Sequence, residues 1–162
     1  MPKTTMDEID LLILQALQRD ARISNADLAE AVGLSPSPCL RRVRSLEQRG
    51  ILRGYRADLD RVRVGLGLTA FVAIKVERHQ VTETAPLTDA IVAMPEVISC
   101  HLVSGDADLL LQVVVPSLEY YEDLLFRALL KLPGIVDIKT SFALHTYKAD
   151  APLPIPKHSQ LA

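Results

Sequence analysis

Apolar residues recur at helical spacing in the first third of the chain and at strand spacing in much of the remainder. A capping-box pattern over residues 5–8 predicts a first helix that runs to about Leu17. Two shorter helices are predicted after it, over about 24–32 and 35–49, with Ser24 and Ser35 as N-cap residues. Gly33 and Gly50 stand where a left-handed residue ends a helix. This pair of helices around a tight turn predicts a helix-turn-helix.

The third predicted helix has an apolar side and a basic side. Cys39, Leu40, Val43 and Leu46 fall on one stripe at about 100° per residue, and arginines occupy much of the remainder. Residues 41–56 hold six arginines against the single acid Glu47, a net of +5, although the whole chain carries −2. Charge alone leaves a solvated basic face open as an alternative. The helix-turn-helix pattern around it favours a helix that enters the DNA major groove.

Residues 51–58 are short, alternating and interrupted by Gly54, which predicts a small β-ribbon, the wing of a winged helix-turn-helix. Arginines on such a wing would reach backbone phosphates beside the groove. We expect base or near-base contacts from Ser37, Arg41, Arg42 and Ser45, and phosphate contacts from Arg44, Arg49, Arg53, Tyr55 and Arg56. The candidate DNA-binding set also contains Ser24, Asn25, Ser35 and Pro38.

The remainder of the chain alternates strands and helices. Strands are predicted over 69–77, 97–104, 107–115 and 135–147, and helices over about 82–94 and 117–132. This order is β-α-β-β-α-β, the ferredoxin-like arrangement, so the fold class is α+β. We therefore expect a DNA-binding domain over 1–58, a linker over 59–68, a ferredoxin-like domain over 69–148 and a proline-rich extended tail over 149–162, lying on the surface or on a neighbour.

The strand predicted over 107–115 is apolar on both faces, with the runs Leu109–Leu111 and Val113–Val115. A ferredoxin-like sheet has helices on one face only, so its second face needs another cover. Sheet-to-sheet self-association would supply it, and we expect an oligomer.

Several classes of function find no support in the residues. Cys39 and Cys100 have neither paired nor metal-type spacing, and we expect free thiols in a reducing cytoplasm. No signal peptide or membrane span is predicted. The four histidines share no zinc-type spacing, and no nucleophile motif or phosphate loop occurs. We expect no catalytic residues, no metal and no cofactor.

Four stretches carry a resemblance to a known family: 20–25 (DARISN), 33–43 (GLSPSPCLRRV), 50–52 (GIL) and 101–108 (HLVSGDAD). With them, the chain resembles the Lrp/AsnC family of bacterial transcription factors (leucine-responsive regulatory protein and asparagine regulator), and within it the leucine-responsive members. The resemblance extends from about Met6 to Pro154.

The resemblance implies a cytoplasmic, nucleoid-associated regulator that binds double-stranded DNA and assembles through its C-terminal domain into dimers and up to octamers. It also implies that a small effector, usually an amino acid, binds near a Gly-Asp-x-Asp turn, here Gly105–Asp108. Asp108 would receive the α-ammonium group, and backbone amides at Ser104 and Gly105 would hold the carboxylate. The implied effector-binding set is Leu102, Ser104, Gly105, Asp106 and Asp108. Ala107 departs from the family, which often has an aromatic residue there.

Two alternatives from other classes remain open on this scaffold. Sirohaem decarboxylases resemble the family in both domains, although the arginine face here is intact and no histidine pair is visible. A second alternative is an architectural protein that wraps DNA with little sequence preference.

Overall fold

The computed structural model describes residues 6–77, 85–149 and 151–155 of the 162-residue chain. Contacts divide the chain into two compact units. One holds the residues up to Asp58 together with the tail from Lys148, and the other runs from Leu59 to Tyr147. Within the described ranges, no helix combines the length and apolar character needed to cross a bilayer.

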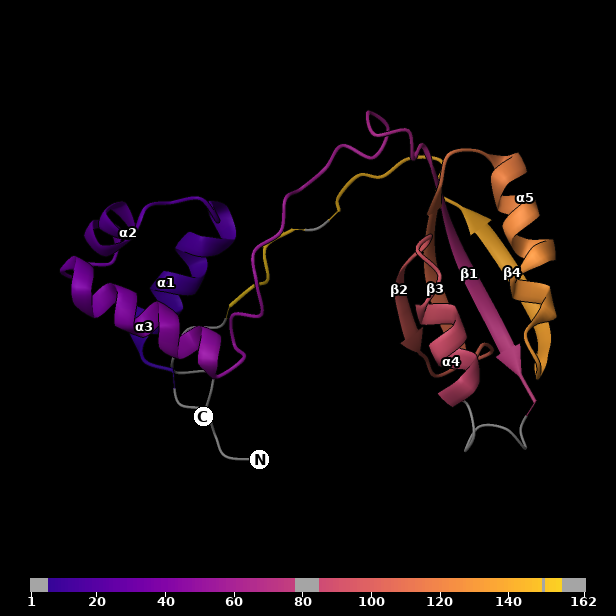
Figure 1. Cartoon of the computed structure of the whole chain (residues 1–162), viewed down its shortest axis with the longest axis horizontal. Coiled ribbons are helices and arrows are strands. Elements are labelled where there is room, and N and C mark those ends of the chain that lie inside the picture. Colours follow the sequence, from indigo (N-terminus) through magenta and orange to yellow (C-terminus); the bar gives the residue numbers. More distant parts are fainter. Residues whose placement is uncertain (1–5, 78–84, 150, 156–162) are drawn as a thin grey trace. The chain divides into compact units, whose positions relative to one another are not determined.

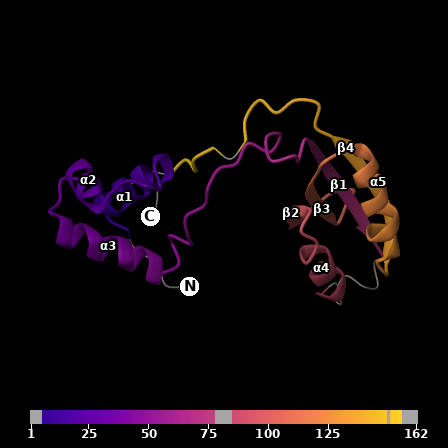
Figure 2. The same ribbon diagram turned by 45° about the horizontal axis from the view of Figure 1, so that its top comes forward.

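The N-terminal unit is built from α1 (Glu8–Arg19), α2 (Asn25–Ala31) and α3 (Pro36–Gln48). In both views α3 runs along α1 and α2 (Figures 1 and 2). The predicted caps hold at α2, where the Ser24 hydroxyl accepts the backbone N–H of Asp27, and at Gly33, whose φ is +71°. Ser35 has N-cap backbone geometry at α3, but its side chain makes no cap hydrogen bond.

The start of α1 differs from the sequence prediction. Asp7 is the N-cap, and it forms a reciprocal capping box with Asp10; residue 5 lies outside the described residues. On this helix Leu14 is buried and Leu12 is exposed. An aspartate three residues before another aspartate satisfies the first free N–H groups as well as a threonine–glutamate pair does.

The predicted β-ribbon over 51–58 was wrong. These residues are described and form no strand. A strand requires a neighbouring backbone to complete its ladder, and no strand is formed by the described residues of this unit.

The C-terminal unit has the predicted β-α-β-β-α-β order. It contains β1 (Leu68–Val76), α4 (Ala85–Val92), β2 (Val97–Leu102), β3 (Leu109–Val115), α5 (Leu118–Arg127), the 3₁₀ turn η2 (Leu129–Lys131) and β4 (Ile135–Phe142). The sheet order is β2-β3-β1-β4 with all neighbours antiparallel, which is the ferredoxin-like topology (Figure 1).

One face of this sheet forms the core. Residues of β1 and β3 on this face, among them Val72 and Leu111, form one buried cluster with Ile91 of α4 and Tyr121 of α5. On the opposite face of β1, Phe71 is exposed. On α5 of the same unit, Leu118 is exposed and Leu124 is buried.

Two strand ends differ from the sequence prediction. The turn between β2 and β3 is not a two-residue hairpin at Gly105–Asp106, because β2 ends at Leu102 and β3 begins at Leu109. The last strand ends at Phe142 rather than at Tyr147. Its partner β1 begins at Leu68, so residues beyond 143 have no strand beside them to continue the ladder.

Candidate functional site

The outer face of α3 carries a shallow hollow. Because the helix turns about 100° per residue, residues spaced three, four, seven, eight and eleven apart gather on this side. The hollow is lined by Ser37, Leu40, Arg41, Arg44, Ser45 and Gln48. Four of the predicted contact residues, Ser37, Arg41, Arg44 and Ser45, are therefore together on one surface. We call this set of six residues the outer face of α3.

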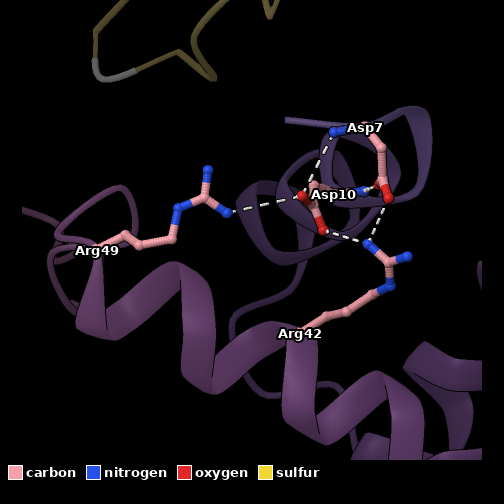
Figure 3. A network of polar contacts seen from close by, with 4 residues as sticks. All are labelled: Asp7, Asp10, Arg42 and Arg49. Carbon is pink, nitrogen blue, oxygen red and sulfur yellow. Dashed lines mark hydrogen bonds and ion pairs between the residues drawn. The ribbon is translucent and has the colours of Figure 1, made fainter. Parts of the chain in front are cut away.

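Arg42 points the other way, toward α1 (Figure 3). Its Nη1 donates to Asp7 Oδ2 at 2.6 Å and to Asp10 Oδ1 at 2.8 Å. Arg49, the C-cap of α3, lies in the same network, with its Nη1 3.9 Å from Asp10 Oδ2. Both guanidinium groups therefore face the nearly buried carboxylate of Asp10, and the DNA contacts expected of Arg42 and Arg49 remain predictions.

The network also changes the ionisation of its members. The backbone N–H of Asp10, and then the Arg42 guanidinium, lower the pKa of the Asp7 carboxyl below its ordinary value. Hydrogen bonds to Asp7 and Asp10 raise the pKa of Arg42.

Asp10, whose side chain is 9% exposed, pairs with both arginines. It connects the first turn of α1 to the middle and the end of α3.

The predicted contact residues around the turn take part in the local fold. Ser24 caps α2, and its hydroxyl donates to Asp27 Oδ2 at 2.6 Å. The Asn25 side-chain amide donates to the Pro36 carbonyl at 2.9 Å, which joins α2 to the first residue of α3. Ser35 and Pro38 lie at the N-cap and in the first turn of α3. Asn25 thereby links the two helices of the motif by a hydrogen bond.

A second hollow follows α3 and is lined by Arg53, Gly54 and Arg56. Two guanidinium groups beside an exposed glycine form a cationic surface suited to a phosphate. Tyr55, in contrast, directs its hydroxyl to Glu47 Oε1 at 3.0 Å. The pKa of the Tyr55 phenol is raised, mainly by burial and to a smaller extent by this hydrogen bond.

In the C-terminal unit, the predicted effector residues lie on the β2–β3 connection, 103–108, and at the adjoining end of β2. Leu102, Ser104, Gly105 and Asp106 are exposed. Gly105 has a φ of +123°, a backbone conformation that favours glycine. The described residues contain no group of three His, Cys, Asp or Glu side chains placed to hold a metal ion.

Asp108 fastens this connection to the end of β1. Its Oδ2 accepts the backbone N–H of Val76 at 2.9 Å, and its own N–H donates to the Ile74 carbonyl at 2.9 Å. Val76 lies at a register shift of the β1–β4 ladder, where a backbone N–H needs an acceptor outside the ladder. One carboxylate oxygen of Asp108 therefore has a structural role.

Sequence reasoning missed Leu40 on the outer face and the buried Asp10 in the network with Arg42 and Arg49. A signal for the inward arginines was nevertheless present. Residues 39, 42, 46 and 49 are spaced by three, four and three, so Arg42 and Arg49 share the phase of Cys39 and Leu46, both fully buried. Leu40 is in phase with the polar residues 37, 44 and 48.

Comparison with known families agrees with this geometry. Residues 6–53 match the model of a winged helix-turn-helix DNA-binding domain, and residues 69–153 match that of the Lrp/AsnC ligand binding domain. The leucine-responsive regulatory proteins of Klebsiella pneumoniae and of Escherichia coli K12 are each 42% identical over 147 residues, which is 91% of this chain and 90% of theirs.

Solved structures show the same similarity. A transcriptional regulator from Neisseria meningitidis in complex with L-Met is 37% identical with a TM-score of 0.87, and the match covers 93% of this chain and 97% of that one. An AsnC family regulator from Agrobacterium tumefaciens is 38% identical with a TM-score of 0.86, over 92% and 97%. The chain belongs to the Lrp/AsnC family of DNA-binding transcriptional regulators.

Proposed function

We propose that the outer face of α3 reads DNA bases and that the hollow at Arg53 and Arg56 binds backbone phosphate. The observation that carries this proposal is the division of the arginines of α3: Arg41 and Arg44 line the outer hollow, while Arg42 pairs with α1. Bidentate arginine–guanine contacts specify sequence, whereas phosphate contacts are alike for all sequences.

The test begins with selection of bound fragments from random or genomic DNA, followed by fluorescence anisotropy on the selected site. Arg41→Gln should relax discrimination at one base pair by about 1–3 kcal/mol. Arg53→Gln should weaken all sequences alike and reduce the salt slope by about one unit. Arg127→Gln, which removes the same charge from an exposed i,i+4 pair with Asp123 in the other unit, is the control and should leave binding unchanged.

Two results would contradict the proposed DNA-binding roles. A specific binder prefers its site over random DNA by about a thousandfold or more at physiological salt. If random DNA competed as well as the selected site, the protein would be an architectural protein that wraps DNA and not a sequence-specific regulator. Uniform loss of affinity in both Arg41→Gln and Arg53→Gln would contradict the assignment of roles.

For the effector we propose an amino acid bound at the β2–β3 connection, with Asp108 receiving the α-ammonium group and the amides of Ser104 and Gly105 receiving the carboxylate. The match of residues 69–153 to a ligand-binding domain and the L-Met complex of a similar regulator support this proposal. Leu102 and Asp106 would complete the site. Because Asp108 Oδ2 accepts the Val76 N–H, the ammonium would be received by the second oxygen, Oδ1.

A thermal-shift screen against the twenty amino acids tests the effector proposal. A ligand at a hundred times its dissociation constant adds about 2.7 kcal/mol to the stability of the native state. Asp108→Asn keeps an acceptor for Val76 but removes the charge, so it should abolish the shift while the melting temperature without ligand changes little. An unchanged shift in Asp108→Asn would remove Asp108 from the site.

We further propose that the protein works as a homo-oligomer, from dimer to octamer, in the bacterial cytoplasm and nucleoid, without catalytic activity. The second face of the sheet supports association, because the pairings of β1 with β3 and β4 place Phe71, Ala73 and Leu110 together there, and Phe71 is 41% exposed. Phe71→Asp should shift the mass measured by light scattering toward the monomer. A Soret band on mixing the protein with a haem precursor would instead favour an enzyme on this scaffold.

A further inference from the structure

The C-terminal tail returns to α1 of the DNA-binding unit, where one side chain contacts its backbone twice. The Leu153 N–H donates to Gln18 Oε1 at 2.6 Å, and Gln18 Nε2 donates to the Leu153 carbonyl at 3.3 Å. Two residues later, Ile155 packs against the buried cluster that contains Leu14 and Leu17 of α1. Gln18 directly follows Leu17, so the polar and the apolar contact are adjacent on one helix.

The sequence of the tail fits this mode of binding. Proline alternates with apolar residues over 152–156 (PLPIP), so Leu153 and Ile155 are the two residues there that carry a backbone N–H. Both are used: that of Leu153 on Gln18, and that of Ile155 on the Leu153 carbonyl at 2.9 Å. Proline also restricts φ before docking, which lowers the entropy lost when the segment is ordered.

The side chains of Leu153 and Ile155 differ in exposure. Leu153 is 74% exposed, so it is held by its backbone, whereas Ile155 is partly buried against the helix. The contact is therefore made by the Gln18 amide and the Ile155 side chain, with the Leu153 side chain outside it.

We propose that α1 carries a docking site for the chain's own tail segment Pro152–Ile155, and that the docked tail is a structural part of the DNA-binding unit. In the linear chain, the unit then adjoins the effector-binding domain at two places, after Asp58 and before Lys148. Asp10 of α1 pairs with Arg42 and Arg49 of α3. A tail that orders α1 therefore also stabilises the position of α3. The family match to the helix-turn-helix extends only over 6–53 and assigns no part of the tail to this unit.

The test uses the full chain with three single substitutions and one double. Ile155→Asp and Gln18→Ala should each lower the melting temperature of the DNA-binding unit by about 4–8 °C, and should speed amide hydrogen exchange in the second half of α1. Alanine is the stronger helix former, so any loss in Gln18→Ala must come from the lost contact and not from helix propensity. Leu153→Ala is the matched control, because it keeps the backbone groups and should behave as the wild type.

The double variant Gln18→Ala/Ile155→Asp separates docking from independent local effects. If both residues serve one docked segment, the double variant should lose little more than either single variant. Additive losses would overturn the proposal, as would exchange rates in α1 that match the wild type in all variants. The affinity for the selected DNA site should fall in parallel; this last measurement rests on the proposed function, whereas the exchange measurement does not.

Discussion

Replacing Asp10 by asparagine removes the negative charge that the two inward arginines of α3 share. Asp10 Oδ1 accepts Arg42 Nη1 at 2.8 Å, and a hydrogen bond between charged groups contributes about 1.5–3 kcal/mol. The Arg49 pair at 3.9 Å, with its arginine side chain 31% exposed, adds less than about 1 kcal/mol. Asparagine retains a carbonyl oxygen as acceptor, so the expected loss for Asp10→Asn is about 1–2 kcal/mol.

The assay is urea unfolding followed by far-UV circular dichroism, since the chain contains no tryptophan. The two units can unfold in separate transitions, so hydrogen exchange in α1 and α3 assigns the loss to the N-terminal unit. A double-mutant cycle with Arg42→Gln isolates the pair: the coupling energy should be about 1–2 kcal/mol. Additive effects within about 0.5 kcal/mol would refute the view that Asp10 and Arg42 act together.

The same cycle has a consequence for DNA binding. The charge of Arg42 is compensated by Asp7 and Asp10, so Arg42→Gln should leave the salt slope of DNA binding unchanged even where it lowers stability. Arg41→Gln, with the same change of charge on the outer face, should reduce the slope. A reduced slope in Arg42→Gln would show that Arg42 leaves α1 to bind phosphate.

Three further outcomes follow from the geometry. The folded-state pKa of Asp7 lies below its ordinary 3.8, so its contribution to stability is present above about pH 4 and is lost as the pH falls through the folded value; the difference in melting temperature between wild type and Asp7→Asn should therefore shrink in acid. Gly33→Ala should cost about 1–2 kcal/mol in urea unfolding, because φ is +71° with open space around the position, whereas Gly67→Ala, at a glycine without positive φ, should cost less. Asp108→Ala, which leaves the part-buried Val76 N–H without its acceptor, should lose about 1–3 kcal/mol of stability, measured by calorimetry, and Asp108→Asn should lose less.

Much of the fold could be predicted because local patterns determine it. Ser24 and Gly33 mark the ends of α2 by the chemistry of their own backbone groups. Two similar stretches, 94–97 (MPEV) and 132–135 (LPGI), each place a proline after a helix. They mark the starts of β2 at Val97 and of β4 at Ile135. The two-residue period of a strand predicted which residues of β1 share a face.

Contacts between distant parts of the chain were decided only by the tertiary structure. Helical spacing puts Arg42 in phase with buried residues, but an ion pair with Asp10, 32 positions earlier, depends on how α1 packs on α3. The predicted β-ribbon failed for a related reason: alternation specifies a strand only where a second backbone pairs with it, and among the described residues of this unit none does so with 51–58. The hydrogen bonds between Leu153 and Gln18, 135 residues away, likewise could not be predicted from the tail sequence. The alternating prolines favour an extended tail but do not specify what it contacts. Neighbours in sequence therefore determined the elements and their faces, whereas the partners of Arg42, Asp108 and the tail required the packed structure that brings distant backbone and charge together.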